Sequence, residues 1–224
     1  MRRPTVSEVL FESYCSRNAV PFSRIPTDSG RRTPDYCVEL SENSVVAEVK
    51  QFDPTDLEEQ LQRLFETEGF TPAFGGKPGQ RASQSIKDGV KQLRLLGKNR
   101  YPTLLVFYNN VPITNRHVDP YAIKTAMYGL EAMILGVPGE SDGPPTLLAR
   151  QFGGRRTLTP AHNTTLSAVA VLSSNPVDNS PSLRIFHNIY AFLPLNPDWL
   201  RNTETRHYTL GEKHSLQFQE WIEL

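Results

Sequence analysis

Three charged side chains stand in a stretch that otherwise alternates like a β-hairpin. Residues 33–52 read TPDYCVELSENSVVAEVKQF, with Asp35 at the start of one expected strand and Glu48 and Lys50 in the other. Strand interiors disfavour all three residue types unless the face that carries them is solvated or is occupied by something that needs charge. Which of these two explanations holds decides what can be inferred about function.

The hairpin places the three charges on one side of the sheet. With the turn between Glu42 and Asn43, Asp35 stands opposite Lys50, and Cys37 stands opposite Glu48. Facing residues of an antiparallel pair project from the same side, and residues two apart in a strand do as well. One carboxylate from each strand and one ammonium group therefore converge, while the opposite face is apolar and consists of Tyr36, Val38, Leu40, Val45, Ala47 and Val49.

Two neighbouring carboxylates have a natural use in metal chemistry. They repel and raise each other's pKa unless a cation lies between them. Mg²⁺ and Mn²⁺ suit such oxygen ligands. A lysine beside them can orient an attacking water or balance the charge of a phosphate in its transition state. This set of residues is the minimum for metal-assisted hydrolysis of a phosphodiester.

The surrounding elements predict an α/β fold. Helical spacing of apolar residues is followed by extended, alternating and unbroken apolar segments, which is typical of strands connected through helices. In the first half we expect a helix over 5–18, a short extended piece over 21–26, the hairpin, a helix after residue 53, a Gly- and Pro-rich loop over 71–82, a helix over 83–99 and a buried strand from 103. In the second half we expect a helix over 119–130 and strands over 131–137, 166–174 and 183–195, whereas the tail from 196 is unassigned.

The charged motif resembles that of the PD-(D/E)XK nuclease superfamily. The motif here is Pro34-Asp35, a gap of twelve residues, and then Glu48-Val49-Lys50. The resemblance implies a restriction-endonuclease-like core of a helix, a three-strand meander, a helix and a further strand over residues 1–110. Residues 111–224 would then extend the sheet and add accessory strands and helices within a single domain spanning 1–224.

The resemblance also implies roles for individual residues. Asp35 and Glu48 would bind Mg²⁺ or Mn²⁺, with the Val49 carbonyl as a third ligand, and Lys50 would orient the nucleophilic water. Family members tend to place a glutamate of the first helix at the metal site. Glu8 and Glu12 are both available, and Glu8 is our choice because it lies nearer the apolar stripe of that helix.

Basic and polar residues near the motif are candidates for binding nucleic acid. A polar stripe on the helix over 83–99 can neutralise phosphates, although such a stripe is also what a solvated helix face looks like. The candidates on this helix are Gln84, Lys87 and Lys91, with Arg94 in the same stripe. Loop residues Arg31, Arg32, Lys77 and Arg81 complete the set of candidates, although loops also collect basic residues for solubility.

Composition limits the partners. Lys plus Arg and Asp plus Glu both number 24, so there is no global basic field that would attract DNA. Binding would depend on a local patch, on a partner protein that delivers the substrate, or on a homodimer. Two cysteines, no apolar leader and no apolar run of about 20 residues predict a cytoplasmic protein without a membrane partner. The histidines lack the spacing of a zinc site.

Three functions remain open at this level. The first is a Mg²⁺-dependent deoxyribonuclease, expected to be an endonuclease. The second is a catalytically silent subunit of the same fold that binds or scaffolds within a nucleic-acid-processing or defence assembly, since a fold does not fix a function. The third makes Asp35, Glu48 and Lys50 a salt-bridge ladder on a solvated face of the sheet.

Overall fold

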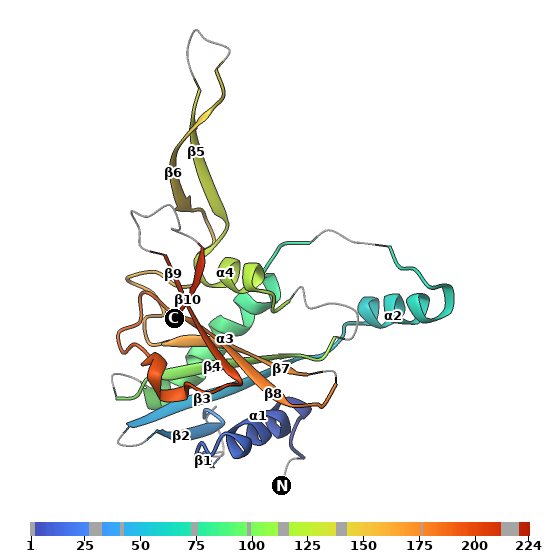
Figure 1. Cartoon of the computed structure of the whole chain (residues 1–224), viewed down its shortest axis with the longest axis vertical. Helices are drawn as coiled ribbons and strands as arrows, with labels where there is room; N and C mark the ends of the chain where they lie inside the picture. Colours follow the sequence, from blue (N-terminus) through green and yellow to red (C-terminus); the bar gives the residue numbers. More distant parts are fainter. Residues whose placement is uncertain are drawn as a thin grey trace.

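A mixed sheet with helices on both faces organises the chain (Figure 1). The structure is a computed structural model that describes residues 3–26, 33–40, 43–72, 76–97, 100–111, 117–137, 143–175, 177–211 and 220–224. Its helices are α1 (Val6–Arg17), α2 (Asp56–Glu68), α3 (Gln80–Gly97), α4 (Pro120–Tyr128) and the short 3-10 helix η1 (Pro197–Leu200). Its strands are β1 (Phe22–Arg24), β2 (Tyr36–Leu40), β3 (Asn43–Phe52), β4 (Thr103–Asn109), β5 (Glu131–Gly136), β6 (Thr146–Phe152), β7 (Ala168–Ser174), β8 (Pro181–His187), β9 (Thr205–Leu210) and β10 (Trp221–Glu223).

Within the described ranges, eight strands lie side by side in the order β1-β2-β3-β4-β7-β8-β9-β10. The first three form an antiparallel meander. The chain then passes through α2 and α3 and returns as β4, parallel to β3, and β7 is in turn parallel to β4. The second half of the chain thus adds strands to the sheet that the first half begins.

Each face of the sheet has its own apolar core. On one face, α1 contributes Phe11, Tyr14 and Cys15 to a cluster with Tyr36, Val38 and other strand residues. On the opposite face, α3 and α4 pack through a second cluster that includes Ile86, Val90, Leu93, Ile123 and Met127. β4 supplies Leu104 and Val106 to the first cluster and Leu105 and Phe107 to the second, which explains its unbroken apolar sequence.

The α/β class and most of the predicted elements are confirmed. The helix predicted over 5–18 is α1, which begins with a capping box between Thr5 and Glu8. α3 begins at Gln80, three residues earlier than predicted, so the loop before it is shorter. Part of that loop, residues 73–75, lies outside the described residues.

The second half departs further from the predictions. The strand predicted over 183–195 begins at Pro181 and ends at His187, while β6, β9 and β10 were not predicted. β6 is almost fully exposed and β10 is a short strand at the edge of the sheet, so neither needs an alternating apolar pattern. Of the two cysteines, Cys15 is buried and Cys37 is half-buried, and both thiols are free.

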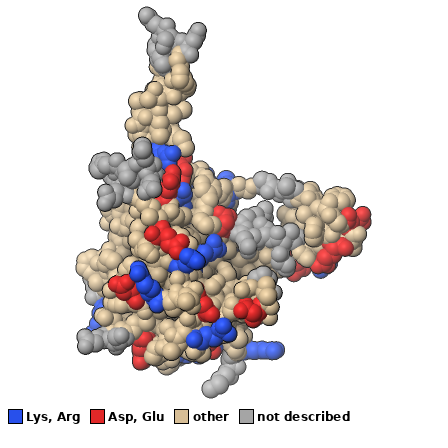
Figure 2. All heavy atoms as spheres, viewed as in Figure 1, with Lys and Arg blue, Asp and Glu red and all other residues tan. Residues whose placement is uncertain are grey.

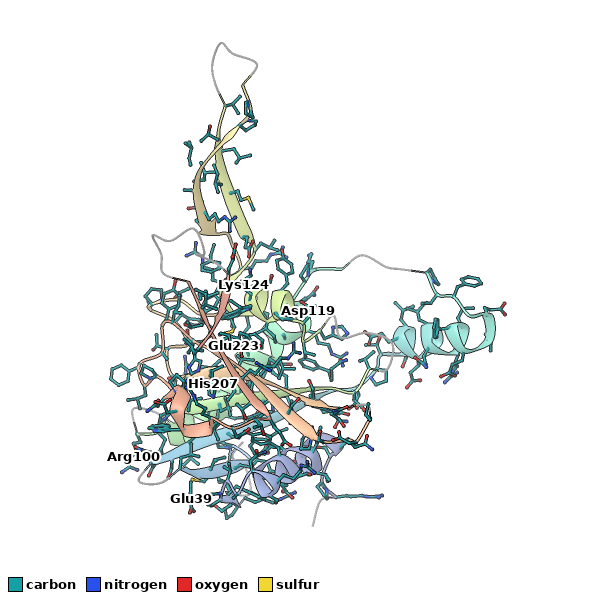
Figure 3. All side chains as sticks on the ribbon, in the orientation of Figure 1. Glu39, Arg100, Asp119, Lys124, His207 and Glu223 are labelled. Atoms are coloured by element: carbon teal, nitrogen blue, oxygen red, sulfur yellow. The ribbon has the colours of Figure 1, made fainter. Side chains whose placement is uncertain are left out.

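Strands β5 and β6 form a separate antiparallel pair that projects from the body as an arm (Figure 1). At its base, Lys124 of α4, labelled in Figure 3, pairs with Glu131, and Arg150 pairs with Glu220. Beyond these pairs the described part of the arm carries no charged side chain, and Figure 2 shows an almost uncharged surface there. Its exposed apolar residues are Leu130, Met133, Ile134, Leu135, Val137, Leu147 and Leu148.

None of the helices in the described ranges combines the length and the apolarity that crossing a bilayer requires.

Candidate active site

The hairpin register brings Asp35 beside Glu48 rather than opposite Lys50. β2 and β3 pair Tyr36 with Ala47 and Leu40 with Asn43, a shift of two residues from the predicted register. The predicted register was wrong because strand pairing extends to Asn43, which we had placed in the turn. Since the shift is even, every side chain keeps its predicted face, and the three charges still share one side of the sheet.

The carboxyl groups of Asp35 and Glu48 form the centre of the site. Asp35 Oδ2 accepts a hydrogen bond of 2.9 Å from the backbone N–H of Val49. Glu48 is 1% exposed, because β3 is an interior strand of the sheet and α3 covers this face. Glu48 Oε1 accepts a hydrogen bond from Lys50, whereas no described residue bonds its Oε2. A buried carboxylate oxygen without a partner is costly, so this atom calls for a proton, which Glu48 can share in a hydrogen bond with Asp35, or for a bound cation.

Burial raises the pKa of both carboxyl groups. Burial raises the pKa of Glu48 to about 7, and the negative charge of Asp35 adds to the rise while Lys50 opposes it. Burial also raises the pKa of Asp35, although the N–H of Val49 opposes the rise. Near neutral pH the pair is therefore poised between holding a proton and holding a cation.

Lys50 is fixed by two acceptors. Its ammonium group donates to Glu48 Oε1 and, over 2.7 Å, to Gln92 Oε1. Gln92 belongs to α3, so this helix supports the charged cluster directly. An ammonium group has three donors, and the third can reach a further acceptor such as a water or a phosphate oxygen.

The sequence analysis did not identify Gln92 as a site residue. It named Gln84 of the same helix instead. The available signal was its position beside the apolar stripe of Ile86, Val90 and Leu93. Gln92 lies about 100° around the helix from this stripe, so it is near the border of the buried face. Only the packing of α3 on β3 shows which border faces Lys50.

Glu8 lies close enough to influence the cluster, whereas Glu12 is engaged elsewhere. The charge of Glu8 contributes to the raised pKa of Asp35, after burial. Glu8 is nearly buried, and its Oε2 accepts the backbone N–H of Thr5 over 2.7 Å. Glu12 instead accepts hydrogen bonds from Tyr36 and Arg24. These contacts favour Glu8 over Glu12 as the α1 residue nearest the site.

The predicted nucleic-acid-binding residues do not form one group. Lys77, Gln84 and Lys87 line a cavity on another flank of α3, and Lys91 pairs with Asp88 over 2.9 Å. Arg81 contacts the carbonyl of Asp53, the Glu58 carboxylate and the ring of Phe52. Arg81 is thus held within the protein and is 30% exposed. Arg31 and Arg32 lie outside the described residues.

The donors present suit a hard cation. Over the described ranges, no group of three or more His, Cys, Asp and Glu side chains could hold a metal ion by itself. Asp35 and Glu48 supply two carboxylates, and further ligands would have to be backbone carbonyls and waters. That is the ligand set Mg²⁺ accepts, since it keeps several waters and takes one or two carboxylates. The unpartnered Oε2 of Glu48 is an open oxygen donor at this point.

Comparison with known proteins adds no evidence on function, so any inference about function rests on the residues described above. No protein-family model, no curated protein and no solved structure was found to match this chain.

Proposed function

We propose that this protein is a metal-dependent nuclease that hydrolyses DNA phosphodiester bonds, and that it acts as an endonuclease. One observation carries the proposal: Glu48, buried in an interior strand, meets Asp35 and keeps one oxygen without a described partner, while Lys50 is held beside it. A folded domain gains nothing in stability from this arrangement, because a buried carboxylate next to a second one is costly.

The element order supports a restriction-endonuclease-like core. A helix, a three-strand antiparallel meander, two helices and a strand parallel to the last meander strand follow one another from α1 to β4, so α2 is an addition to the implied core and α3 is the helix that packs on the meander. The two motif strands, β2 and β3, are the second and third strands of that meander. This is the order the resemblance implies for residues 1–110.

The residues fit Mg²⁺ or Mn²⁺. Asp35 and Glu48 would hold the ion, and the Val49 carbonyl is the proposed third protein ligand. When bound, such an ion supplies a Lewis acid for a phosphate oxygen and lowers the pKa of a coordinated water.

The chain's own side chains have separate tasks in this proposal. Lys50 uses its third donor to orient the attacking water and to stabilise negative charge on the phosphate. Gln92 positions the Lys50 ammonium group through the 2.7 Å hydrogen bond. Glu8 adds negative charge near Asp35 and supports an outer water or a second ion.

The salt-bridge ladder receives less support than the nuclease. It needs a solvated face, whereas Glu48 is 1% exposed. A silent scaffolding subunit stays the main alternative because binding and catalysis can use the same fold. Metal binding distinguishes the two, because a scaffold has no need for a cation at Glu48.

DNA is the proposed substrate. Because the net charge of the chain is zero, the protein attracts DNA weakly by itself, and we propose that a partner protein delivers the substrate. The free thiols agree with the reducing cytoplasm that we propose as the location.

We assign the arm of β5 and β6 to contact with a second copy of the chain. Seven apolar side chains in the described part of the arm are exposed, and beyond the ion pairs at its base no charged side chain interrupts them; exposed apolar surface of this kind is typical of interaction sites. A two-stranded hairpin is marginally stable alone, and pairing the described apolar parts of two arms would cover both.

The function is tested with purified wild type, Glu48→Gln and Lys50→Ala on supercoiled, linear and single-stranded DNA with Mg²⁺, Mn²⁺ or EDTA. We expect metal-dependent cutting by the wild type alone. Calorimetric titration should show that Lys50→Ala still binds Mn²⁺ and that Glu48→Gln does not. Undiminished cutting by either variant would refute the assigned site, and absence of both cutting and metal binding in the wild type would favour the scaffold.

A further inference from the structure

A second polar site lies on α3, away from the carboxylate cluster. A cavity of about 840 Å³ opens between the first turns of α3, the end of α4 and the segment that follows β6. The described residues that line it include four cationic side chains, Lys77, Lys87, Arg155 and Arg156, and no carboxylate. Because acids and bases are equal in number over the whole chain, this concentration of one charge is a local feature.

The walls of this cavity are tightly fixed. Gly79 has a φ of +68°, and a Cβ there would lie 2.3 Å from the carbonyl oxygen of Ala122. Gly129 has a φ of +88°, and a Cβ there would lie 2.5 Å from the carbonyl oxygen of Gly154. Both positions therefore require glycine, and both bring backbone segments together at the cavity. A hydrogen bond of 2.8 Å between the hydroxyls of Ser83 and Thr157 also joins two walls.

The cations are presented rather than neutralised. Arg156 donates to the carbonyls of Phe152 and Gly153, which hold its guanidinium group in place. Arg155 adopts a φ of +65°, an uncommon conformation for a residue other than glycine. Among the described residues, no ion pair engages Lys77, Lys87 or Arg155. Like charges gathered in one cavity repel, so an anion that enters it is stabilised.

The cavity and the proposed catalytic cluster use different flanks of α3. Lys87 and Gln92 are five residues apart, which places them roughly 140° apart around the helix axis. Gln92 contacts Lys50, whereas Lys87 lines the cavity. A ligand in the cavity would therefore not compete for Asp35, Glu48 or Lys50.

We propose that this cavity is a phosphate-binding site that takes the backbone of a nucleic-acid strand. Four cations without a carboxylate beside them select phosphate groups, and none of the described lining residues is an aromatic on which a base could stack. A volume of this size holds more than one phosphate group. A free polyphosphate offers the same chemistry, and the experiment below separates the two sources. Arg155 and Arg156 thus join Lys77 and Lys87, which the sequence already suggested for nucleic-acid binding. Binding to this cavity is measured without any cleavage.

The test measures binding of a fluorescent single-stranded DNA oligonucleotide in EDTA and, by calorimetric titration, binding of inorganic tripolyphosphate. We expect Lys87→Ala combined with Arg155→Ala to weaken binding of both ligands at least about tenfold and to reduce the salt dependence by roughly one to two phosphate contacts. Arg63→Ala combined with Arg206→Ala is the matched control, since both arginines are exposed and neither lines the cavity. It should change affinity less than about twofold. Equal thermal melting of all variants shows that they fold.

Each result has one consequence. Weaker binding of both ligands by the cavity variant but not by the control supports the nucleic-acid site, and tripolyphosphate binding without oligonucleotide binding overturns the strand as ligand but keeps the phosphate site. Equal losses in the cavity variant and in the control, or no binding of either ligand, overturn the inference. Glu48→Gln should bind the oligonucleotide like the wild type, so failure of the nuclease proposal leaves this result unaffected.

Discussion

Replacing Glu48 by glutamine should make the protein more stable above neutral pH, relative to wild type, than at acidic pH. In the native state the pKa of Glu48 is about 7, whereas the ordinary pKa of a glutamate is 4.5. Between these two values the native state binds more protons than the unfolded chain. Wild-type stability from this group is therefore lost as pH rises from about 4.5 to about 7.

The magnitude follows from the two pKa values. At about 1.4 kcal/mol for each pKa unit, the interval corresponds to about 3 kcal/mol of unfolding free energy. Glutamine keeps the shape of a protonated glutamate and does not titrate. The difference in stability between Glu48→Gln and wild type should thus grow by about 3 kcal/mol between pH 4.5 and pH 8, whatever its value at pH 4.5.

Urea unfolding in EDTA at pH 4.5, 6 and 8 measures this difference. Glu39→Gln is the matched control, because Glu39 is an exposed glutamate of the same hairpin (Figure 3). Its stability should follow that of the wild type at every pH. A difference for Glu48→Gln that changes by less than about 1 kcal/mol over this range would refute the buried, repelled carboxylate on which the site is built.

Three further predictions concern other parts of the molecule. Gly79→Ala should lower the free energy of unfolding by at least about 2 kcal/mol, because it strains the backbone and collides with Ala122. Urea unfolding measures this loss. Gly76→Ala is the control and should leave stability unchanged, because open space surrounds Gly76. Burial, followed by the nearby imidazole of His207, lowers the pKa of His187 to about 4, so its stabilisation is present above pH 6.5 and is lost as pH falls through 4. His187→Gln should reduce this acid sensitivity in unfolding measured from pH 7 to 4, and an unchanged pH profile would contradict the assignment. Leu135→Ser with Leu148→Ser should convert a dimer into a monomer in light scattering after size exclusion, and a dimer that persists in this variant would exclude the arm as its interface.

The local pattern of the sequence was sufficient for the hairpin faces and for most helices. Alternation in residues 36–49 separates a charged face from an apolar one, and this separation survives the error of two residues in the register. The apolar spacing of Ile86, Val90 and Leu93 likewise predicts the buried side of α3. The stripe predicted for α1 was wrong in part, because Val6 and Val9 are exposed. In α4 a periodic pattern identifies no side, because almost all of the helix is buried. The features that were predicted depend on the periods of strands and helices, which any short segment already contains.

The contacts that give the site its chemistry depend on tertiary structure. α3 packs on β3 so that Gln92, and not Gln84, meets Lys50, while Gln84 and Lys87 turn toward the cavity completed by Arg155 and Arg156. The periodicity of α3 defines two polar borders but does not say which border faces the hairpin. That choice follows from how the helix is seated between the sheet and α4, where Gly79 and Gly89 permit close approach to Ala122 and Leu105. The burial that raises the pKa of Glu48 is likewise a property of the assembled layers, because an isolated hairpin would leave its carboxylate in water.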